Sequence, residues 1–344
     1  MNAAPKLPTL DDVAQAAGVS LATASRALNG STRKVNDDYR VRVLDAAVRL
    51  GYTPNLSAQA MAKGITMTVA LLVGDIADPY FSSIAAGVMR GSTDAGLVVT
   101  MAVTGGDPVR ELALVRFLRG QRPRVMILAG SRRDHDETRR ALVSELQAFE
   151  ASGGRVIMIS QPELPFETVL IDNRTGARLL AIELVKLGYR HFAAISGAPR
   201  LLTSQDRLSG FVDGLAEQGV TISDQHIVHA EFTRDGGFEG ATALLARGID
   251  DVELIFAVND VMAVGAMSAL RSAGRIPGET IAVAGFDDIS TVQDVTPALT
   301  TVRIPLEDVG ARAVELALVP SVIGSADGII LTSVVVRAST PQLR

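Results

Sequence analysis

The hydrophobic pattern changes character after the first 66 residues. Before that point, apolar residues recur at the spacing of amphipathic helices, which predicts a short helix over residues 11–17 and a second one directly after it. Gly18 permits the left-handed backbone that ends the first helix, and Ser20 can cap the second by accepting backbone N–H bonds. The small residues Ala14 and Ala24 let the two helices cross closely. This layout is typical of a helix-turn-helix, whose second helix enters the major groove of DNA.

A third helix is predicted over Asp37–Leu50, because Asn36 can cap it and apolar residues again recur at helical spacing. A further fragment, Leu56–Lys63, ends at Gly64 and is too short to be stable alone. The residues expected on the inward face of the third helix are Val41, Leu44, Ala47 and Val48.

The rest of the chain alternates short apolar runs with amphipathic stretches. The runs predict strands at Val69–Val73, Val98–Val103, Val125–Ala129, Val156–Ser160, Phe192–Ser196, Leu254–Val258 and Ile281–Gly285. The stretches predict helices that include Tyr80–Ala95, Arg110–Leu118, Gly176–Leu187, Gln205–Glu217 and Val261–Ala273. Continuous apolar strands separated by helices favour parallel sheets covered on both faces, and the length fits two such sheets. Three segments are expected to pass between the lobes as a hinge, with a ligand cleft at the carboxyl ends of the strands: Glu167–Asn173, Leu299–Pro305 and Leu331–Arg337.

Composition and charge agree with this division. Residues 1–66 carry 8 basic and 5 acidic side chains, whereas the remainder carries 25 basic and 33 acidic ones. A basic head on an acidic body is typical of a nucleic-acid-binding module joined to another domain. The absence of cysteine excludes disulfides, thiolate metal sites and cysteine nucleophiles. We see no signal peptide and no apolar run of about 20 residues, so a soluble cytoplasmic protein is expected.

Six segments, in this order, resemble the lactose-repressor (LacI/GalR) family of bacterial transcription regulators. They are TLDDVAQAAGVSLATASRALNG at 9–30, LGYTPNLSAQAMA at 50–62, VLIDNRTGA at 169–177, DRLSGF at 206–211, AVNDVMAVGA at 257–266 and VAGFDDI with PALTTVRIP within 283–305. The resemblance covers essentially the whole chain. It implies an all-α, lambda-repressor-like helix-turn-helix head, a hinge helix, and a two-lobed α/β body like the type I periplasmic binding proteins.

The resemblance also implies domain bounds and partners. The head is expected at 1–54, the hinge helix and linker at 55–66, and the body at 67–344, with a first lobe of 67–171 and 304–332 and a second of 173–302 and 333–344. A homodimer is expected to bind a pseudo-palindromic operator in double-stranded DNA, most simply as a repressor. Its affinity would be controlled by a small-molecule effector, from family precedent a sugar or sugar derivative, whose binding selects one closure angle of the lobes. Whether the effector releases DNA or promotes binding stays open.

DNA contact is expected from the second helix and the hinge helix. Arg26 can read guanine O6 and N7 or clamp a phosphate, and the apolar Leu21 and Ala22 favour thymine methyl groups. At Met61 the family usually has a leucine that wedges into the minor groove, so the degree of DNA kinking is open. The full set of expected DNA contacts is Thr9, Ser20, Leu21, Ala22, Thr23, Ser25, Arg26, Asn29, Ala58 and Met61.

Effector contact is expected at the carboxyl ends of the body strands. The family counterpart of Arg207 hydrogen-bonds effector hydroxyls or carboxylates, and Asn and Asp side chains at strand ends suit vicinal hydroxyls. Aromatic side chains can stack on a sugar or base ring. The full set is Tyr80, Phe81, Ser160, Arg207, Phe232, Asn259 and Asp287, whereas Asp260 and Asp288 are expected to cap helices or brace loops.

Three alternatives compete with this interpretation. An α/β enzyme is disfavoured because the chain lacks a strand-linked GxGxxG, a GxxxxGK[ST] loop and a Ser/His/Asp motif. His226 and His229 are interpreted as solvated residues, so no metal or cofactor is expected. A periplasmic solute-binding protein would share the body but needs an export signal and no DNA-binding head. A constitutive DNA-binding protein with a vestigial effector pocket differs from the main hypothesis only in ligand binding.

Overall fold

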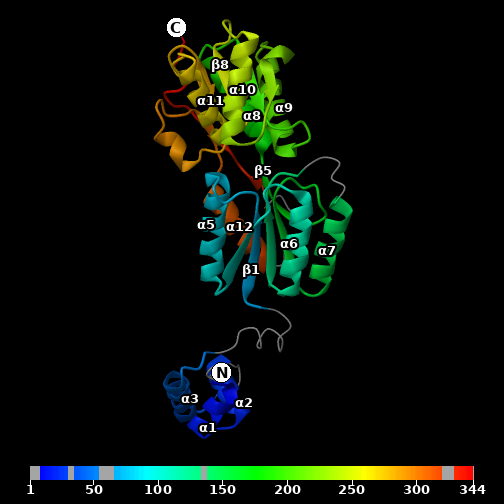
Figure 1. Ribbon diagram of the computed structural model, residues 1–344, viewed down its shortest axis with the longest axis vertical. Helices are drawn as coiled ribbons and strands as arrows, with labels where there is room; N and C mark the ends of the chain where they lie inside the picture. Colours follow the sequence, from blue (N-terminus) through cyan, green and yellow to red (C-terminus); the bar gives the residue numbers. More distant parts are fainter. Residues whose placement is uncertain (1–7, 30–34, 54–65, 133–137, 320–328, 344) are drawn as a thin grey trace, which may run out of the picture. The chain divides into compact units, whose positions relative to one another are not determined.

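The computed structural model describes residues 8–29, 35–53, 66–132, 138–319 and 329–343. The chain forms two compact units, Met1–Thr66 and Met67–Arg344. The first is helical and the second is an α/β body with two separate parallel sheets (Figure 1).

The helical unit contains α1 (Leu10–Ala17), α2 (Leu21–Asn29) and α3 (Asp37–Leu50). As predicted, Gly18 adopts a left-handed conformation with φ 61° and ends α1. Ser20 and Asn36 accept backbone N–H bonds from Thr23 and Asp38, at 3.2 and 2.9 Å. The core is built almost entirely of small side chains, which lets the three helices approach closely. It comprises Val13, Ala14, Ala17, Ala24, Ala27, Val43, Ala46 and Ala47.

The inward face predicted for α3 is wrong in three of its four residues. Val41 and Val48 are 58% and 81% exposed, Leu44 is exposed too, and only Ala47 is buried. The buried face consists instead of Val43, Ala46 and Ala47. The helix carries two apolar stripes at equivalent spacing, and periodicity alone cannot choose between them. The stripe with two alanines packs against α1 and α2 because it permits the closer approach.

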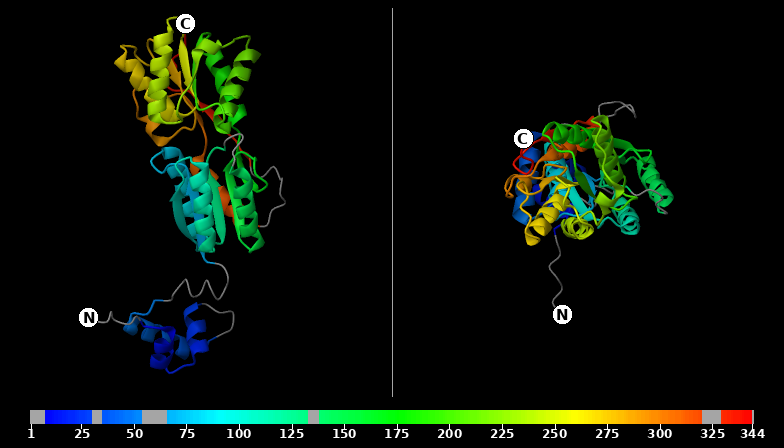
Figure 2. Two further views of the ribbon diagram at one scale, coloured as in Figure 1. Left: turned by 45° about the vertical axis from the view of Figure 1, so that its right-hand side comes forward. Right: turned by 90° about the horizontal axis from the view of Figure 1, so that it is seen from above.

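The first lobe of the body is a six-stranded parallel sheet in the order β11-β5-β4-β3-β1-β2. Its strands are β1 (Thr68–Val73), β2 (Val98–Val103), β3 (Val125–Ala129), β4 (Arg155–Ser160), β5 (Glu167–Ile171) and β11 (Ile329–Ile330). Alternate strand residues belong to two hydrophobic clusters, one on each face of the sheet. The helices α5 (Pro79–Asp94) and α12 (Leu306–Leu318) cover one face, and α6 (Pro108–Gly120) and α7 (Arg139–Ala151) cover the other (Figure 2).

The second lobe is a four-stranded parallel sheet in the order β7-β6-β8-β9. Every residue of β6 (Phe192–Ser196) is buried, because helices pack on both faces of this sheet. The helices α8 and α9 pack against each other, and so do α10 and α11. The remaining bounds are α8 Asn173–Lys186, α9 Leu202–Glu217, η1 Asp224–His226, β7 Ile227–His229, α10 Arg234–Arg247, β8 Leu254–Ala257, α11 Asp260–Ser272, β9 Ala282–Ala284 and η2 Ser290–Gln293.

The predicted elements of the body are confirmed. All seven predicted strands are present, and Val98–Val103, Val125–Ala129 and Phe192–Ser196 have the predicted bounds. The interpretation of His226 as solvated is wrong: its side chain is buried because the 3₁₀ turn η1 packs against β6. Within the described residues, no helix is both long enough and apolar enough to span a bilayer.

The chain passes between the two sheets three times. It leaves the first sheet after β5, returns through β10 (Thr301–Arg303) and α12, and leaves again after β11 through β12 (Ser333–Val335). The strands β10 and β12 form an antiparallel pair of their own. Asp288 bonds to both crossings, because its carboxylate oxygens lie 2.6 Å from the guanidinium groups of Arg303 and Arg337. This confirms the bracing role expected for Asp288 and fixes the crossing pair to the second lobe.

A close helix contact in the first lobe gives a direct test of this packing. A Cβ atom added at Gly87 on α5 would lie 1.9 Å from the backbone oxygen of Glu307, at the start of α12. We therefore expect Gly87→Ala to lower the free energy of unfolding of the body by about 1–3 kcal/mol in urea titrations. Gly120→Ala is the matched control, because a Cβ there meets nothing within 4 Å. Equal stability of the two variants would contradict the observed packing.

Candidate DNA interface and ligand site

The predicted DNA-contacting residues of the head gather at the start and on the outer face of α2. Leu21 is 49% exposed, Ala22 and Arg26 are exposed, and Thr23 and Ser25 are half-buried. This face therefore offers two apolar groups and one guanidinium to a groove, with hydroxyls beside them. Among the other predicted residues, Asn29 closes α2. Ala58 and Met61 lie outside the described residues.

Two of the predicted residues act within the head itself. The hydroxyl of Thr9 donates to Asp12 at 2.7 Å, and Thr9 and Asp12 together form a capping box at the start of α1. The hydroxyl of Ser20 lies 2.8 Å from that of Thr23 and caps α2. Their helix-capping bonds fix the ends of the two helices that a DNA groove would meet.

Arg42 on α3 holds the turn between α1 and α2. Its guanidinium donates to the backbone oxygens of Ala17 and, at 3.5 Å, of Gly18, and it lies 5.7 Å from the centre of the Tyr39 ring. Sequence reasoning missed this residue because its partners are 24 and 25 positions away and a surface arginine on a helix carries no distinguishing signal. The turn therefore depends on a cation from the third helix.

In the body, the structure buries Arg207 at the carboxyl ends of the strands of the second lobe. Only 1% of its surface is exposed, and its guanidinium donates to Asn173 Oδ1 and to the backbone oxygen of Val258, both at 2.8 Å. A third nitrogen lies 2.7 Å from Asp287 Oδ1, and the group stacks 4.0 Å from the centre of the Phe286 ring. One cation thus joins the start of α8, the end of β8 and the end of β9.

Electrostatic coupling brings Tyr80 of the first lobe to this cluster. Burial raises the pKa of the Tyr80 hydroxyl, Asp287 raises it further, and Arg207 lowers it. Burial likewise raises the pKa of Asp287, and the guanidinium of Arg207 opposes that shift. Tyr80 and Phe81 open α5 and meet edge to face, with ring centres 5.0 Å apart. Tyr80 at the start of α5 is therefore within electrostatic reach of the ion pair between Arg207 and Asp287.

The remaining predicted residues occupy neighbouring positions. Asn259 Oδ1 accepts the backbone N–H of Met262 at 2.9 Å and caps α11. Phe232 packs beside Gly197 at the end of β6, where an added Cβ would lie 2.8 Å from its ring. Ser160 at the end of β4 has φ 140°, and its hydroxyl donates to Gln161 at 2.5 Å. Asn259, Phe232 and Ser160 therefore lie at the ends of three different strands and, within the described residues, are not hydrogen-bond partners of Arg207.

Ser160 belongs to a contact between the lobes that the sequence did not reveal. The first turn of α9 donates two backbone N–H groups to the first lobe, from Leu202 to Arg132 O at 3.0 Å and from Thr203 to Ser131 Oγ at 3.1 Å. The hydroxyl of Thr203 also accepts a bond from Gln161 Nε2 at 2.6 Å. The helix that carries Arg207 is therefore also the helix that meets the first lobe.

Asp260 braces the loop before η2, as expected, and also bonds to a crossing strand. Its oxygens accept bonds from the hydroxyl of Thr301 on β10 at 2.6 Å and from the backbone N–H of Ile289 at 2.9 Å. Burial raises the pKa of Asp260 to about 7, against these two bonds, and the nearby Asp288 adds to the rise. This carboxyl therefore links the second lobe to a crossing strand.

A separate surface pocket of about 640 Å³ lies at the far end of α11. It is lined by residues such as Arg271, Arg275, Pro277 and Pro297, and not by the predicted effector residues. Both arginines are engaged, with Thr296 O and Asp250 respectively. The convergent polar groups around Arg207 make the stronger candidate for a ligand site. Within the described residues, no group of three His, Asp or Glu side chains could hold a metal ion.

Comparison with known proteins agrees with both halves of this description. Residues 9–55 match the model of the bacterial regulatory proteins, lacI family, and residues 181–340 match that of a periplasmic binding protein-like domain. The chain is 32% identical over 306 residues to the HTH-type transcriptional regulator DegA of Bacillus subtilis (strain 168), covering 88% of each. It is 33% identical over 317 residues to the regulator GalR of Escherichia coli (strain K12), covering 91% of this chain and 89% of GalR.

Two solved structures resemble nearly the whole chain. A complex of the transcriptional regulator CelR with cellobiose matches with 29% identity and a TM-score of 0.70, covering 96% of this chain and 99% of that one. The Lac repressor dimer bound to operator and the anti-inducer ONPF matches with 26% identity and a TM-score of 0.83, covering 98% and 100%.

The raised pKa of Asp260 predicts a pH-dependent stability. Since the folded value of about 7 lies above the ordinary 3.8, the folded body holds a proton that the unfolded chain releases. The stabilisation by this proton is present at low pH and is lost as the pH rises from about 4 to 7. We expect Asp260→Asn, which stays neutral, to gain roughly 1 kcal/mol or more relative to the wild type between pH 5 and pH 8. The measurement is urea unfolding across this range.

Asp250→Asn serves as the control, because the Asp250 side chain is 92% exposed. It should leave the pH profile of the wild type unchanged. If the free energy of unfolding changed with pH in parallel in the wild type and in Asp260→Asn, Asp260 would stay ionised in the folded body.

The bonds from Arg42 to the turn predict that removing this side chain weakens DNA binding, although Arg42 is not among the expected DNA contacts. Arg42→Ala removes the donors to the turn, and we expect operator affinity to fall about tenfold, as for a hydrogen bond from a charged group. Arg42→Lys should recover part of the loss. Arg49→Ala removes the same charge from an exposed site on the same helix and should have a smaller effect. Operator affinity is measured by fluorescence anisotropy. If Arg42→Ala and Arg49→Ala lowered it equally, the loss would come from the removed charge and not from the bonds to the turn.

Proposed function

Because the chain belongs to the lacI family of bacterial regulatory proteins, we propose that it is a sequence-specific transcription regulator controlled by a sugar. In this proposal its head binds operator DNA and represses transcription, and its body binds the effector. The observation that carries it is the presence, in one chain, of a helix-turn-helix unit and a two-lobed body with buried polar groups at its strand ends.

The exposed face of α2 supplies the DNA contacts. Arg26 reads a guanine edge or holds a phosphate through its planar fork, and Leu21 and Ala22 meet thymine methyl groups. Thr23 and Ser25 add hydroxyl bonds to phosphates or bases. The caps at Thr9 and Ser20 keep the helix ends in place for these contacts.

The cluster around Arg207 supplies the effector site. A guanidinium has five N–H donors, and here one nitrogen each is directed to Asn173, Val258 and Asp287. Further N–H donors and the Asp287 carboxyl suit the vicinal hydroxyls of a sugar, and Tyr80 offers an aromatic ring from the other lobe. The cellobiose bound to the related CelR supports a carbohydrate effector.

The effector acts by selecting one arrangement of the lobes. Its hydroxyls bridge the Arg207 cluster and the first lobe, so binding changes how the two heads of a homodimer are presented to paired half-sites. The relative crystallised as a dimer on operator supports this assembly and a pseudo-palindromic site. The protein thus acts on DNA in the cytoplasm, with no catalytic role and no cofactor.

One observation favours a second candidate, a constitutive DNA-binding regulator with a non-functional pocket. Arg207, Asp287 and Asn259 already have partners within the protein, at 2.7–2.9 Å. A pocket whose polar groups are satisfied internally gains less from a ligand. Calorimetric titration with a panel of mono- and disaccharides separates the two candidates, because only the main proposal predicts binding.

Selection of bound sequences from random duplex DNA tests the DNA half of the proposal. The wild type should enrich a near-palindrome, whereas Arg26→Ala should lose preference at one position of each half-site and bind about 5- to 150-fold more weakly. Arg26→Lys should keep phosphate contact but lose bidentate base contact. If Arg26→Ala retained the wild-type preference and affinity, Arg26 would have no role in recognition.

A further inference from the structure

A basic segment in the body has no role in the function proposed above. Residues 116–124 read RFLRGQRPR, with four arginines and no acidic residue, although acidic residues outnumber basic ones in the body as a whole. Short arginine-rich segments are typical of surfaces that bind polyanions. The segment comprises the end of α6, a tight turn and the approach to β3.

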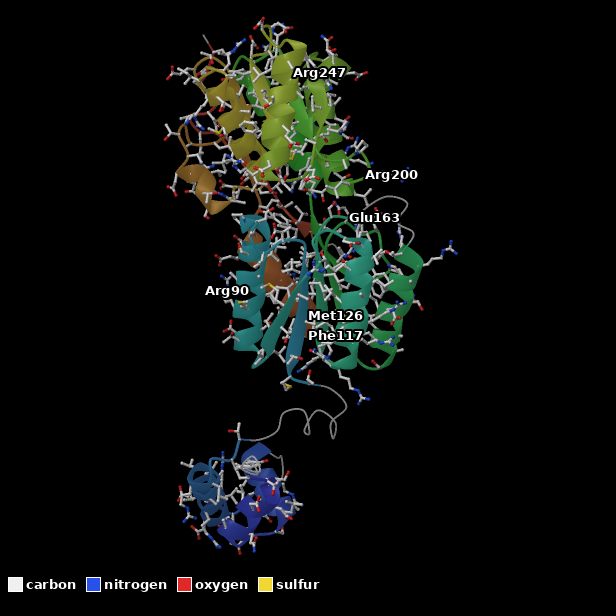
Figure 3. All side chains as sticks on the ribbon, viewed as in Figure 1. Arg90, Phe117, Met126, Glu163, Arg200 and Arg247 are labelled. Carbon is white, nitrogen blue, oxygen red and sulfur yellow. The ribbon has the colours of Figure 1, made fainter. Side chains whose placement is uncertain are left out.

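The fold places this segment at the end of the first lobe where the amino termini of its strands lie. The backbone N–H of Arg124 donates to Thr68 O at 2.9 Å, and that of Arg155 donates to Arg124 O at 3.1 Å. Thr68, Arg124 and Arg155 therefore form a row across the starts of β1, β3 and β4. Phe117, labelled in Figure 3, lies on the same end of α6. Since β1 is the first described element after α3, the chain enters the body from the DNA-binding unit at this end of the sheet.

The turn presents its arginines outward. Arg122 adopts φ 53°, and the proline that follows it restricts the backbone further. Arg122 and Arg124 are both exposed. We refer to Arg116, Arg119, Arg122 and Arg124 as the strand-start patch.

The patch carries an excess of positive charge. Arg116 and Arg119 share a single carboxylate, that of Glu145, at 2.9 and 2.6 Å. Arg155, beside the patch, is paired with Glu167 at 2.6 Å. Within the described residues, no carboxylate forms an ion pair with Arg124 at 4.0 Å or less. Arg116 and Arg119 share one acid and Arg124 is exposed beside them, so these three guanidinium groups provide a surface that attracts phosphates.

We propose that the strand-start patch binds the phosphate backbone of the DNA on which the head is bound. This inference rests on the proposed function, because the head brings the DNA. The edge that receives the chain from the head is the part of the body tethered most closely along the sequence to bound DNA. Guanidinium groups there add affinity without sequence preference, since phosphates are the same at every base pair.

Charge reversal in the full-length protein tests the proposal. With the selected operator, Arg124→Glu should weaken binding about tenfold near 0.1 M salt and lower the slope of log affinity against log salt by about one or more. Arg140→Glu is the matched control, because Arg140 is exposed at the start of α7, on the opposite edge of the same lobe. It should leave the slope of the wild type unchanged. An unchanged slope in Arg124→Glu overturns the proposal.

Proximity can be measured independently of affinity. The chain has no cysteine, so Arg124→Cys gives a single attachment point for an iron–EDTA cleavage reagent. The modified protein should cleave the operator backbone at defined positions, whereas modified Arg140→Cys should not. Failure of the wild type to bind any selected DNA would refute the proposed function. Normal operator binding with no cleavage from position 124 would refute this inference alone.

Discussion

The second lobe depends on one buried guanidinium. Arg207 bonds to Asn173, Val258 and Asp287 and stacks on Phe286, so it fixes the ends of three segments that are far apart in the sequence. A buried cation without partners would be severely destabilising, which makes each of these bonds a structural requirement. The same helix begins with Leu202 and Thr203, which bond to the first lobe. The Arg207 cluster, which is the proposed ligand site, and the contact between the lobes therefore share the helix α9.

The DNA-binding unit is a small helical domain with a small hydrophobic core. The eight buried side chains among its described residues are alanine and valine, so its geometry depends on polar contacts as well as on burial. The capping box at Thr9, the cap at Ser20 and the guanidinium of Arg42 together set the angle between α1 and α2. A domain held in this way presents its recognition helix as a unit, and its position on DNA can be shifted without changing the helix itself.

Much of this architecture could be predicted from the sequence, because strands buried on both faces appear as continuous apolar runs. The bounds of β3 and β6 follow directly from such runs. The buried face of α3 could not be predicted, since Val41, Leu44 and Val48 have the same spacing as the stripe that packs. At the ligand site, the motifs pointed to Arg207 and Asp287. Their partner Asn173 and the contact between Ser131 and Thr203 are ordinary polar residues whose roles arise only from the tertiary fold.

In the mechanism proposed here, the arrangement of the two lobes controls operator binding. A disulfide between Ser131→Cys and Thr203→Cys tests it without knowledge of the effector, because Ser131 Oγ lies 3.1 Å from the backbone nitrogen of Thr203 across the lobes and the natural chain has no cysteine. The measurement is the operator dissociation constant of the double variant, oxidised and reduced. If the lobes control operator binding, the dissociation constants of the two forms should differ by at least about fivefold, the lower limit of a typical allosteric coupling. Equal affinities of the fully oxidised and fully reduced protein would contradict it.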